Sequence, residues 1–364
     1  MNIKRWLALA FWTSLLLMLC YPLPESQTAL AQPASTPQAE LQAASKKMFF
    51  PVVTRQNYVH VPPLPSTSYY MTTVDPALSY QEGCKAGTRD RDLPGVQDSV
   101  VILDYGIPRE RNGVLGASGM WRTGFVTLEQ IAVSVQNFGL GYYNCTGSDW
   151  QSRIIIGIGT NNYNTGVVTR AHGEAWAEMV NAVNEWFTNR GVTQQVIAVG
   201  ANDIELAWNS PGITREWLEG YDSKNQYPLY NFGALDGCPR FAAPDATCGS
   251  YGYYPSRVWT KEQVWYAIWG SPPVYPLPEI YARNGVNAEQ WYLMSDYAIK
   301  NHGQAIQFIG VMTTYGACQQ VGGCNGIDNR PEEGWNQLTK LIMGTPHTAV
   351  GAPRYSTDII WYGE

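Results

Sequence analysis

Short apolar runs rich in β-branched residues recur from about residue 97 to the end of the chain, and most of them end in a polar residue or a glycine. Runs of this length and composition are typical of strands that are buried on both faces of a parallel sheet. They predict about eight strands, at 100–106, 139–145, 153–160, 194–201, 227–234, 264–270, 275–281 and 305–313.

Helical periodicity lies between several of these runs. The clearest case is 171–190, in which apolar residues recur at steps of three and four and Gly191 is placed to end the helix. Thr127 and Gln130 form a capping box that would open another helix. A strand, a helix and a second strand in succession imply parallel strands joined by a right-handed crossover. Shorter helices are expected near 214–218, 287–298 and 332–343.

The fold class follows from this alternation. We predict an α/β fold, an irregular (β/α)8-type (TIM-like) barrel with fewer helices than strands, the missing helices being expected between the second and third strands and around the sixth. An open doubly wound sheet is the alternative, because periodicity alone does not separate the two. The barrel is favoured because acidic and amide residues follow the strand runs, and a barrel brings the carboxyl ends of all strands to one mouth. Residues 97–364 have a length typical of one such barrel.

The first part of the chain predicts export. Residues 1–31 have the order of a secretory signal peptide, with basic residues, an apolar run and small residues ending at Ala31. Cleavage there would make the protein secreted or extracytoplasmic, and no later apolar run is long enough to span a membrane. A lipid anchor at Cys20 is the less favoured alternative. Residues 32–47 predict a flexible linker, and the proline-punctuated residues 48–96 predict an extended N-terminal arm on the barrel.

Removing the signal leaves six of the seven cysteines, an even number that suggests disulfides in an exported chain. Fifteen pairings are possible for six cysteines. Short separation favours two pairs and leaves a third: Cys238 with Cys248, Cys318 with Cys324, and Cys84 with Cys145. A structural zinc site would need closely spaced Cys and His residues, whereas the four histidines are scattered. We therefore expect no metal ion and no other cofactor.

Charge and aromatic content narrow the class of partner. The formal net charge is −6 and Lys and Arg form no block, so a surface that follows nucleic-acid phosphates is not expected. The chain has 14 Trp and 23 Tyr but only 9 Phe, a bias toward rings with a polar group. Such rings often lie at the edge of a core. They also suit sugar-binding clefts, where the ring stacks on the sugar and its N–H or O–H bonds a hydroxyl.

Polar and aromatic residues stand at or near the ends of the predicted strands, where a barrel would bring them together. The candidate substrate-binding residues are Asn144, Asn161, Asn231, Trp269, Glu279, Tyr281 and Gln307. Three carboxylic residues are the candidates for chemistry. Asp104 ends the first strand, and Asp203 and Glu205 follow the fourth, two residues apart and therefore able to face the same side.

Glycoside hydrolysis needs one carboxylic acid to protonate the leaving oxygen and a second carboxylate to attack, to activate water or to stabilise the transition state. Glu205 is the candidate acid, because its longer side chain reaches further into a cleft. Asp203 would be the supporting carboxylate, and Asp104 would orient substrate or water. A nearby like charge would keep one of these acids protonated. The competing interpretation is local, with Asp203 capping a helix and Asp104 serving a turn.

The order of these motifs resembles that of the Chalaropsis-type lysozymes, glycoside hydrolase family 25. The resemblance rests on Asp104, on GYYN at 141–144, on the DIE tripeptide at 203–205, on EIY at 279–281 and on IQF at 306–308. It implies a barrel with too few helices, cleavage of the β-1,4 link after N-acetylmuramic acid in peptidoglycan, and an acid at Glu205. The family writes Gly-x-Asp-x-Ser at its first strand, where this chain has Ile-Leu-Asp-Tyr-Gly. That departure leaves the substrate open.

The function predicted from the sequence is a secreted glycoside hydrolase-like protein that cleaves a cell-envelope or extracellular polysaccharide, peptidoglycan among them, by carboxylate acid/base catalysis. The alternative is a non-catalytic barrel that binds glycans or serves as a surface-associated structural protein. The carboxyl groups distinguish the two, because a catalyst needs them within reach of one glycosidic oxygen.

Overall fold

The computed structural model describes residues 60–119, 124–163, 165–249 and 258–363. The predicted signal peptide at 1–31 and the linker at 32–47 lie outside the described residues. In the part of the chain that the structure describes, no helix combines the length and the apolar character that crossing a membrane requires.

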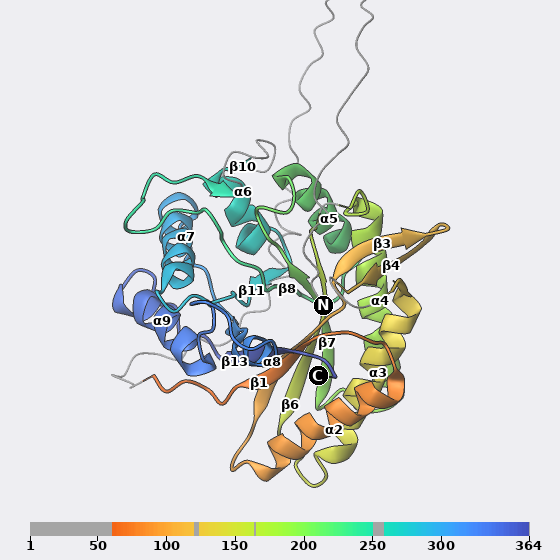
Figure 1. The fold of residues 1–364 in the computed structure, drawn as a ribbon. Coiled ribbons are helices and arrows are strands. Elements are labelled where there is room, and N and C mark those ends of the chain that lie inside the picture. Colours follow the sequence, from red (N-terminus) through yellow and green to blue (C-terminus); the bar gives the residue numbers. More distant parts are fainter. Residues whose placement is uncertain (1–59, 120–123, 164, 250–257, 364) are drawn as a thin grey trace, which may run out of the picture. The chain divides into compact units, whose positions relative to one another are not determined.

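Eight parallel strands form one sheet in which neighbours in space follow the order of the chain (Figure 1). The last of them pairs with the first, so the sheet curves back on itself. The strands are β1 (Ser66–Tyr70), β2 (Asp98–Asp104), β6 (Arg153–Asn161), β7 (Val196–Asp203), β8 (Leu229–Asn231), β11 (Val274–Pro276), β12 (Gly310–Thr313) and β13 (Tyr355–Trp361).

The remaining gap, between β11 and β12, is closed by backbone hydrogen bonds. The Ile309 and Met312 amides donate to the carbonyls of Pro276 and Pro278, at 3.0 and 2.9 Å. Glu279 then forms a parallel bridge with Met312. A ring of strands in chain order is the (β/α)8 barrel, so the predicted fold class is confirmed and the open doubly wound sheet is excluded.

Helices follow the strands on the outside of this ring, and every pair of consecutive barrel strands is joined by at least one helix. The helices are α2 (Pro76–Asp92), α3 (Leu128–Cys145), α4 (Arg170–Asn189), α5 (Pro211–Lys224), α6 (Lys261–Trp265) with the π-helical turn η2 (Tyr266–Gly270), α7 (Val286–His302), α8 (Tyr315–Gln320) and α9 (Pro331–Gly344). A small antiparallel sheet precedes α3 and consists of β3 (Ile107–Arg111), β4 (Val114–Ser118) and β5 (Val126–Thr127). Further along the chain, β9 (Cys248–Gly249) pairs with β10 (Val258–Trp259).

The core has two layers, as alternation along each strand requires. On β7, Val196 and Ala198 pack outward with the helices, whereas Val199 and Ala201 belong to the smaller cluster inside the barrel. Helix α4 shows how the outer layer is held. Its Thr169 cap accepts the His172 amide, and the buried Trp176 indole donates to the Ile158 carbonyl of β6 at 3.0 Å.

Two predicted strands are helical. The run at 139–145 is the last part of α3, which the capping box of Thr127 and Gln130 opens as expected. Its glycines permit close helix packing: a Cβ on Gly141 would lie 2.1 Å from the Tyr80 carbonyl oxygen of α2. The run at 264–270 belongs to α6 and η2, and a second capping box, formed by Thr260 and Gln263, opens α6. The helices expected to be missing are therefore present.

The extended arm predicted for 48–96 is wrong over its described part. Ser66–Tyr70 is the first barrel strand, and Pro76–Asp92 is a helix opened by Asp75, whose carboxylate accepts two backbone amides. The sequence signal was weak because β1 carries serines on the face that lies inside the barrel, where Ser68 bonds Thr357 of β13 at 2.7 Å.

All three cysteine pairs favoured by their spacing form disulfides: Cys84 with Cys145, Cys238 with Cys248, and Cys318 with Cys324. The first joins α2 to the end of α3, and the other two close surface loops near the carboxyl ends of the strands. Disulfides are typical of proteins from oxidising compartments.

Candidate active site

The carboxyl ends of the barrel strands place a group of acidic side chains on the inner face of the barrel. On β2, Val100 and Ile102 line the interior, so alternation turns Asp104 inward as well. On β7, Val199 and Ala201 do the same for Asp203. The barrel fold therefore brings together two carboxylates that lie 99 positions apart in the printed sequence.

Three of the acids are close enough to act on one bond. One carboxyl oxygen each from Asp203, Glu205 and Glu279 lie within 4.8 Å of one another. The three residues are 5%, 9% and 8% exposed. The sequence predicted Asp203 and Glu205 as a catalytic pair, and it predicted Glu279 only as a substrate contact. The structure adds Glu279, which follows the sixth barrel strand, β11, to the carboxyl cluster, which we define as Asp203, Glu205 and Glu279.

Glu205 is held at its backbone by an amide from the neighbouring strand. The Asn162 side chain accepts the Glu205 amide at 3.0 Å and donates to the Glu205 carbonyl at 3.1 Å. The Glu205 carboxylate accepts the Ala234 amide at 2.8 Å. Glu205 is therefore fixed from two sides although it lies beyond the end of β7.

Glu279 is held by the closure of the barrel and by a tyrosine. Its neighbour Ile280 donates its amide to the Met312 carbonyl of β12 at 2.9 Å. The Tyr281 hydroxyl donates to Glu279 Oε1 at 2.6 Å. This is a short hydrogen bond to a carboxylate, and it stabilises the negative charge on Glu279 relative to the protonated form.

Burial raises the pKa of every acid in this part of the barrel. It raises the pKa of Asp104 to about 6 and that of Glu205 to about 7, with the charge of Asp236 adding to the second shift. The pKa values of Asp203 and Glu279 are raised well above the ordinary range by burial and then by the neighbouring carboxylates. None of the ion pairs among the described residues includes any of these four acids.

The cluster therefore shares protons at neutral pH. After burial, the charge of Glu205 is the largest influence that raises the pKa of Glu279. Protonation of Glu205 removes that charge, and the Tyr281 hydroxyl lowers the pKa of Glu279 further, whereas burial, the largest influence, continues to raise it. One protonated and one ionised carboxyl group within a short distance is the arrangement that acid and nucleophile roles require.

The raised pKa of Asp104 predicts a pH-dependent stability. In the unfolded chain this carboxyl ionises near 3.8, whereas in the folded chain it ionises near 6. Its contribution to folding is thus complete below pH 3.8 and is lost as pH rises through 6, by about 3 kcal/mol. Asp104→Asn keeps an acceptor for the Gly106 amide but cannot ionise. Urea unfolding should show the variant more stable than wild type at pH 8 by up to about 3 kcal/mol. The difference should disappear toward pH 4, and a gap independent of pH would contradict the buried charge.

The hydrogen bond from Tyr281 predicts a shift in the pH profile. Tyr281→Phe removes a donor to a charged group, worth about 1.5–3 kcal/mol, and so raises the pKa of Glu279. The acidic limb of kcat/KM, which reports the ionisation of the free enzyme, should move upward by about one pH unit or more. A fall in activity with an unmoved limb would show that Tyr281 only packs against its neighbours.

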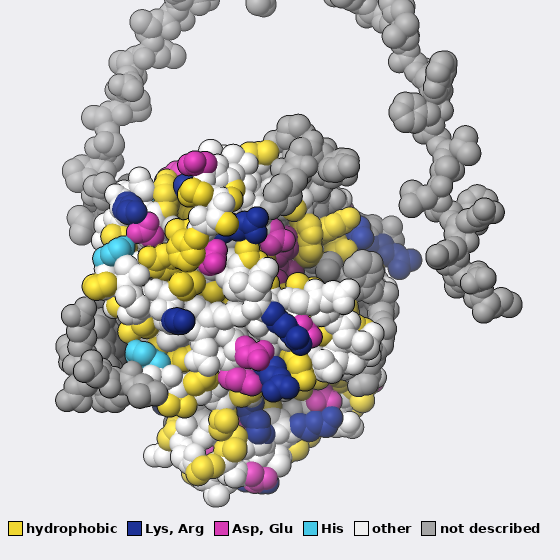
Figure 2. Space-filling view, turned by 60° about the vertical axis from the view of Figure 1, so that its left-hand side comes forward, with side chains coloured by type: hydrophobic (Ala, Val, Ile, Leu, Met, Phe, Trp, Pro, Cys, Tyr) yellow, Lys and Arg dark blue, Asp and Glu magenta, His cyan; other side chains and the backbone are white. Residues whose placement is uncertain are grey.

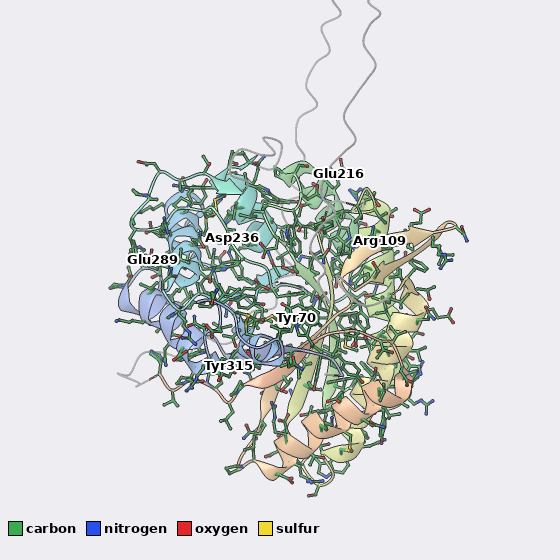
Figure 3. The ribbon with its side chains drawn as sticks, in the orientation of Figure 1. Tyr70, Arg109, Glu216, Asp236, Glu289 and Tyr315 are labelled. Atoms are coloured by element: carbon green, nitrogen blue, oxygen red, sulfur yellow. A yellow bond between two sulfur atoms is a disulfide. The ribbon has the colours of Figure 1, made fainter. Side chains whose placement is uncertain are left out.

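A cavity of about 280 Å³ lies beside the carboxyl cluster, and Asp104 and Tyr281 are part of its wall. Tyr70 and Trp361 form another part, with ring centroids 4.7 Å apart. Figure 3 shows Tyr70 among the barrel strands and Glu216 on the periphery. The remaining wall comes mainly from α8 and the loop closed by Cys318 and Cys324, the other lining residues being Met71, Thr72, Gly106, Gly119, Thr314, Ala317, Val321 and Ile327.

Of the predicted substrate contacts, Asn161 and Tyr281 lie at the site. Asn161 follows the inward-facing Gly157 and Gly159 on β6 and is in register with Asp203 of β7. Its Nδ2 is fully buried and has no hydrogen-bond partner among the described residues, and Asp203 Oδ1 is in the same condition. Buried polar atoms are normally satisfied, so both atoms still have a hydrogen bond to make.

Four predicted substrate contacts lie elsewhere. Asn144 is near the end of α3 and donates to the Tyr80 hydroxyl of α2. Asn231 lies between the inward-facing Tyr230 and Phe232, so it faces away from the interior, and it accepts the Gly233 amide. Trp269 is buried in η2, and Gln307 is exposed before the start of β12, at the opposite end from the acids. Asn144 and Trp269 were predicted as substrate contacts because the helical segments that carry them, α3 and η2, were predicted to be strands.

The sequence analysis missed Tyr70, Trp361 and Asp236. The two aromatic residues end strands that the hydrophobic pattern did not reveal. Asp236 lies in the loop after β8, and burial raises its pKa. Its position beyond a strand end was a usable signal, because the loop begins directly after a strand predicted at 227–234.

The carboxyl cluster also has a spacing that would suit a cation. Three oxygens within 4.8 Å of one another are enough to contact one ion, and hard oxygen ligands favour Mg²⁺, Ca²⁺ or Mn²⁺. A metal ion would need further ligands to complete six or more positions. Of the buried side-chain amides without a partner, Asn161 offers a donor, whereas Asn202, one residue before Asp203, offers an acceptor. The three carboxyl oxygens alone would not complete the shell of such an ion.

Comparisons with known proteins were made for the whole chain. No family model matches it, and no curated protein matches it. Among solved structures it is similar to "Structure of GH113 beta-1,4-mannanase", with a TM-score of 0.40 and 8% identity over 83% of this chain and 88% of that chain. It is also similar to a putative dihydrodipicolinate synthase family protein from Coccidioides immitis, with a TM-score of 0.31 and 11% identity over 70% and 68% of the two chains. Scores this low carry no inference about function, and barrels of this kind host many unrelated reactions.

Proposed function

We propose that this protein is a glycoside hydrolase that cleaves a polysaccharide by carboxylate acid/base catalysis, with Glu205 as the acid. The observation that carries the proposal is the carboxyl cluster itself: three buried acids from two strand ends, with oxygens within 4.8 Å of one another and no cationic partner among the described residues. Buried acids of like charge are costly to fold around. Their retention is explained by a reaction that uses both the protonated and the ionised form.

The roles follow from reach and hydrogen bonding. Glu205 extends beyond β7 and has a pKa raised to about 7, so it can carry a proton to the leaving oxygen near neutral pH. Glu279 receives the Tyr281 hydroxyl bond and is the carboxylate that attacks the anomeric carbon. Asp203 lies deeper on β7, and its free oxygen meets a sugar hydroxyl. Asp104 orients the substrate from the cavity wall.

The separation of the acids favours a double displacement. Retaining glycosidases hold their two carboxyl groups about 5–5.5 Å apart, whereas inverting enzymes need about 6.5–9.5 Å to admit a water molecule. The closest oxygens of Glu205 and Glu279 are no more than 4.8 Å apart. We therefore propose a covalent glycosyl intermediate on Glu279 and retention of the anomeric configuration.

The resemblance of Asp104, of DIE at 203–205 and of EIY at 279–281 to glycoside hydrolase family 25 supports peptidoglycan as the first substrate to test, although GYYN and IQF lie away from the site. The predicted signal peptide with three disulfides supports a site of action outside the cytoplasm. Lys and Arg side chains are scattered over the face shown in Figure 2 rather than gathered in one patch, which fits a glycan better than a nucleic acid.

The test is release of reducing ends from peptidoglycan, mannan and a panel of other polysaccharides by the secreted protein, with and without EDTA. The proposal expects hydrolysis of at least one polysaccharide that EDTA does not change. Hydrolysis that EDTA abolishes would replace the acid pair by a metal-dependent reaction at the same cluster. Binding of a polysaccharide without any hydrolysis would favour the non-catalytic alternative.

A further inference from the structure

The cavity beside Asp104 has the composition of a site for a cation. Its wall combines one carboxylate, Asp104, with the rings of Tyr70, Tyr281 and Trp361. Among the described residues of this wall there is no Lys, Arg or His. Aromatic faces attract an ammonium group through their quadrupole, and a carboxylate beside them adds a charge partner.

More carboxyl groups lie around this cavity than hydrolysis of a glycosidic bond requires. An acid and a nucleophile account for two carboxyl groups, yet Asp104, Asp203 and Asp236 lie near them and influence the pKa values of the same cluster. Buried carboxyl groups are normally paired with a cation or coordinate a metal. Within the described residues that partner is missing, and a cationic ligand would supply it to those acids that ionise.

Individual polar atoms near the cavity also lack hydrogen-bond partners among the described residues. The Asp104 side chain accepts one hydrogen bond from the described residues, through Oδ1 from the Gly106 amide at 2.9 Å, although the residue is only 3% exposed. Asp203 Oδ1 is buried without a partner. Across from it in register, the free Asn161 Nδ2 offers a donor for a hydroxyl or ring oxygen. Of these three residues, Asp104 is the one in the described wall of the cavity, so its carboxylate is the acceptor that an ammonium group there can reach.

We propose that the cavity beside Asp104 binds a hexosamine with a free amino group, so that the preferred glycan contains sugars that are not N-acetylated. The ammonium group contacts Asp104 and the rings of Tyr70 and Trp361, which line the cavity with it. A cavity of about 280 Å³ lies at the small end of ligand pockets, which suits one such sugar rather than a longer segment. This names the substrate class of the proposed hydrolase and rests on that proposal only for the cleavage step.

Binding and cleavage are tested separately. Isothermal titration is made with glucosamine and galactosamine oligosaccharides and with the matched N-acetylated oligosaccharides, on the full secreted protein. The aminated form of at least one pair should bind at least about tenfold more tightly than its acetylated counterpart, because loss of a buried charge pair costs that much or more. Equal or tighter binding of the acetylated forms in both pairs would overturn the inference, even if the protein hydrolyses N-acetylated glycans as a true hydrolase.

Two variants locate the contact. Asp104→Asn should weaken the aminated ligand at least about tenfold and change the acetylated ligand little. Val321→Ala alters the apolar wall of the same cavity without a change in charge and should affect both ligands alike. An unchanged preference in Asp104→Asn would place the amine elsewhere and overturn the site. Binding of the aminated ligand without hydrolysis would leave this inference standing while removing the proposed function.

Discussion

Glu205→Gln is expected to reduce hydrolysis of a polysaccharide by about 100- to 10,000-fold, because the amide cannot donate a proton to the leaving oxygen. The substitution is nearly isosteric and keeps an acceptor for the Ala234 amide, so the fold should persist. An aryl glycoside with a good leaving group needs little protonation. On such a substrate the same variant should lose much less in kcat/KM, which reports formation of the glycosyl intermediate, although water attack on that intermediate still lacks its base. Steady-state kinetics on both substrates measures the difference in kcat/KM.

The matched control is Glu216→Gln, which makes the same chemical change on an exposed residue of α5 (Figure 3). It should behave as wild type on both substrates. Equal losses of Glu205→Gln on the polysaccharide and on the aryl glycoside would remove Glu205 from the role of acid and make it a substrate contact.

Glu279→Ala is expected to lose at least on the order of a thousandfold in rate, since no carboxylate remains to attack the anomeric carbon. A small anion such as azide can enter the space left by the side chain and attack from the same side. Azide should therefore restore turnover of an activated substrate and yield a glycosyl azide of inverted configuration. NMR of the product measures that configuration.

The same azide experiment separates the two carboxylates of the cluster. Asp203→Ala keeps Glu279 and its Tyr281 hydrogen bond, so it should gain no inverted azide product. If azide rescued Asp203→Ala and not Glu279→Ala, the nucleophile would be on β7, and Glu279 would only support it.

The barrel could be predicted from the sequence because several of its strands consist mainly of apolar residues. The runs that became β2, β6 and β7 are continuous and β-branched, as strands covered on both faces must be. Strand β1 was missed because its inner face carries Ser66 and Ser68, which hydrogen-bond to the neighbouring strands β2 and β13 instead of adding apolar residues to the core. The last part of α3 was predicted to be a strand because glycines and aromatic residues are uncommon in helices and common near strand ends. The glycines are there because α2 packs closely on this helix, which the sequence pattern does not show.

The site was predictable only in part, for a related reason. Asp104, Asp203 and Glu205 follow unmistakable strands, so their common position could be inferred from the fold class. Glu279 follows a strand of three residues that is continued by a single bridge, and its hydrogen bond from Tyr281 depends on the closure of the barrel. The cavity is formed in part by β1 and β13, which the hydrophobic pattern did not predict, and by the loop that Cys318 and Cys324 close. No local sequence motif predicts this cavity.

The measurement that tests the account most directly is a side-by-side assay of reducing ends released from the best polysaccharide by wild type, Glu205→Gln, Glu279→Gln and Glu216→Gln, each shown to be folded by circular dichroism. The account predicts hydrolysis by wild type and Glu216→Gln, and loss of at least about a hundredfold in each of the two cluster variants. Hydrolysis that survives in both cluster variants would contradict it, because the bond would then be broken without the buried carboxyl pair.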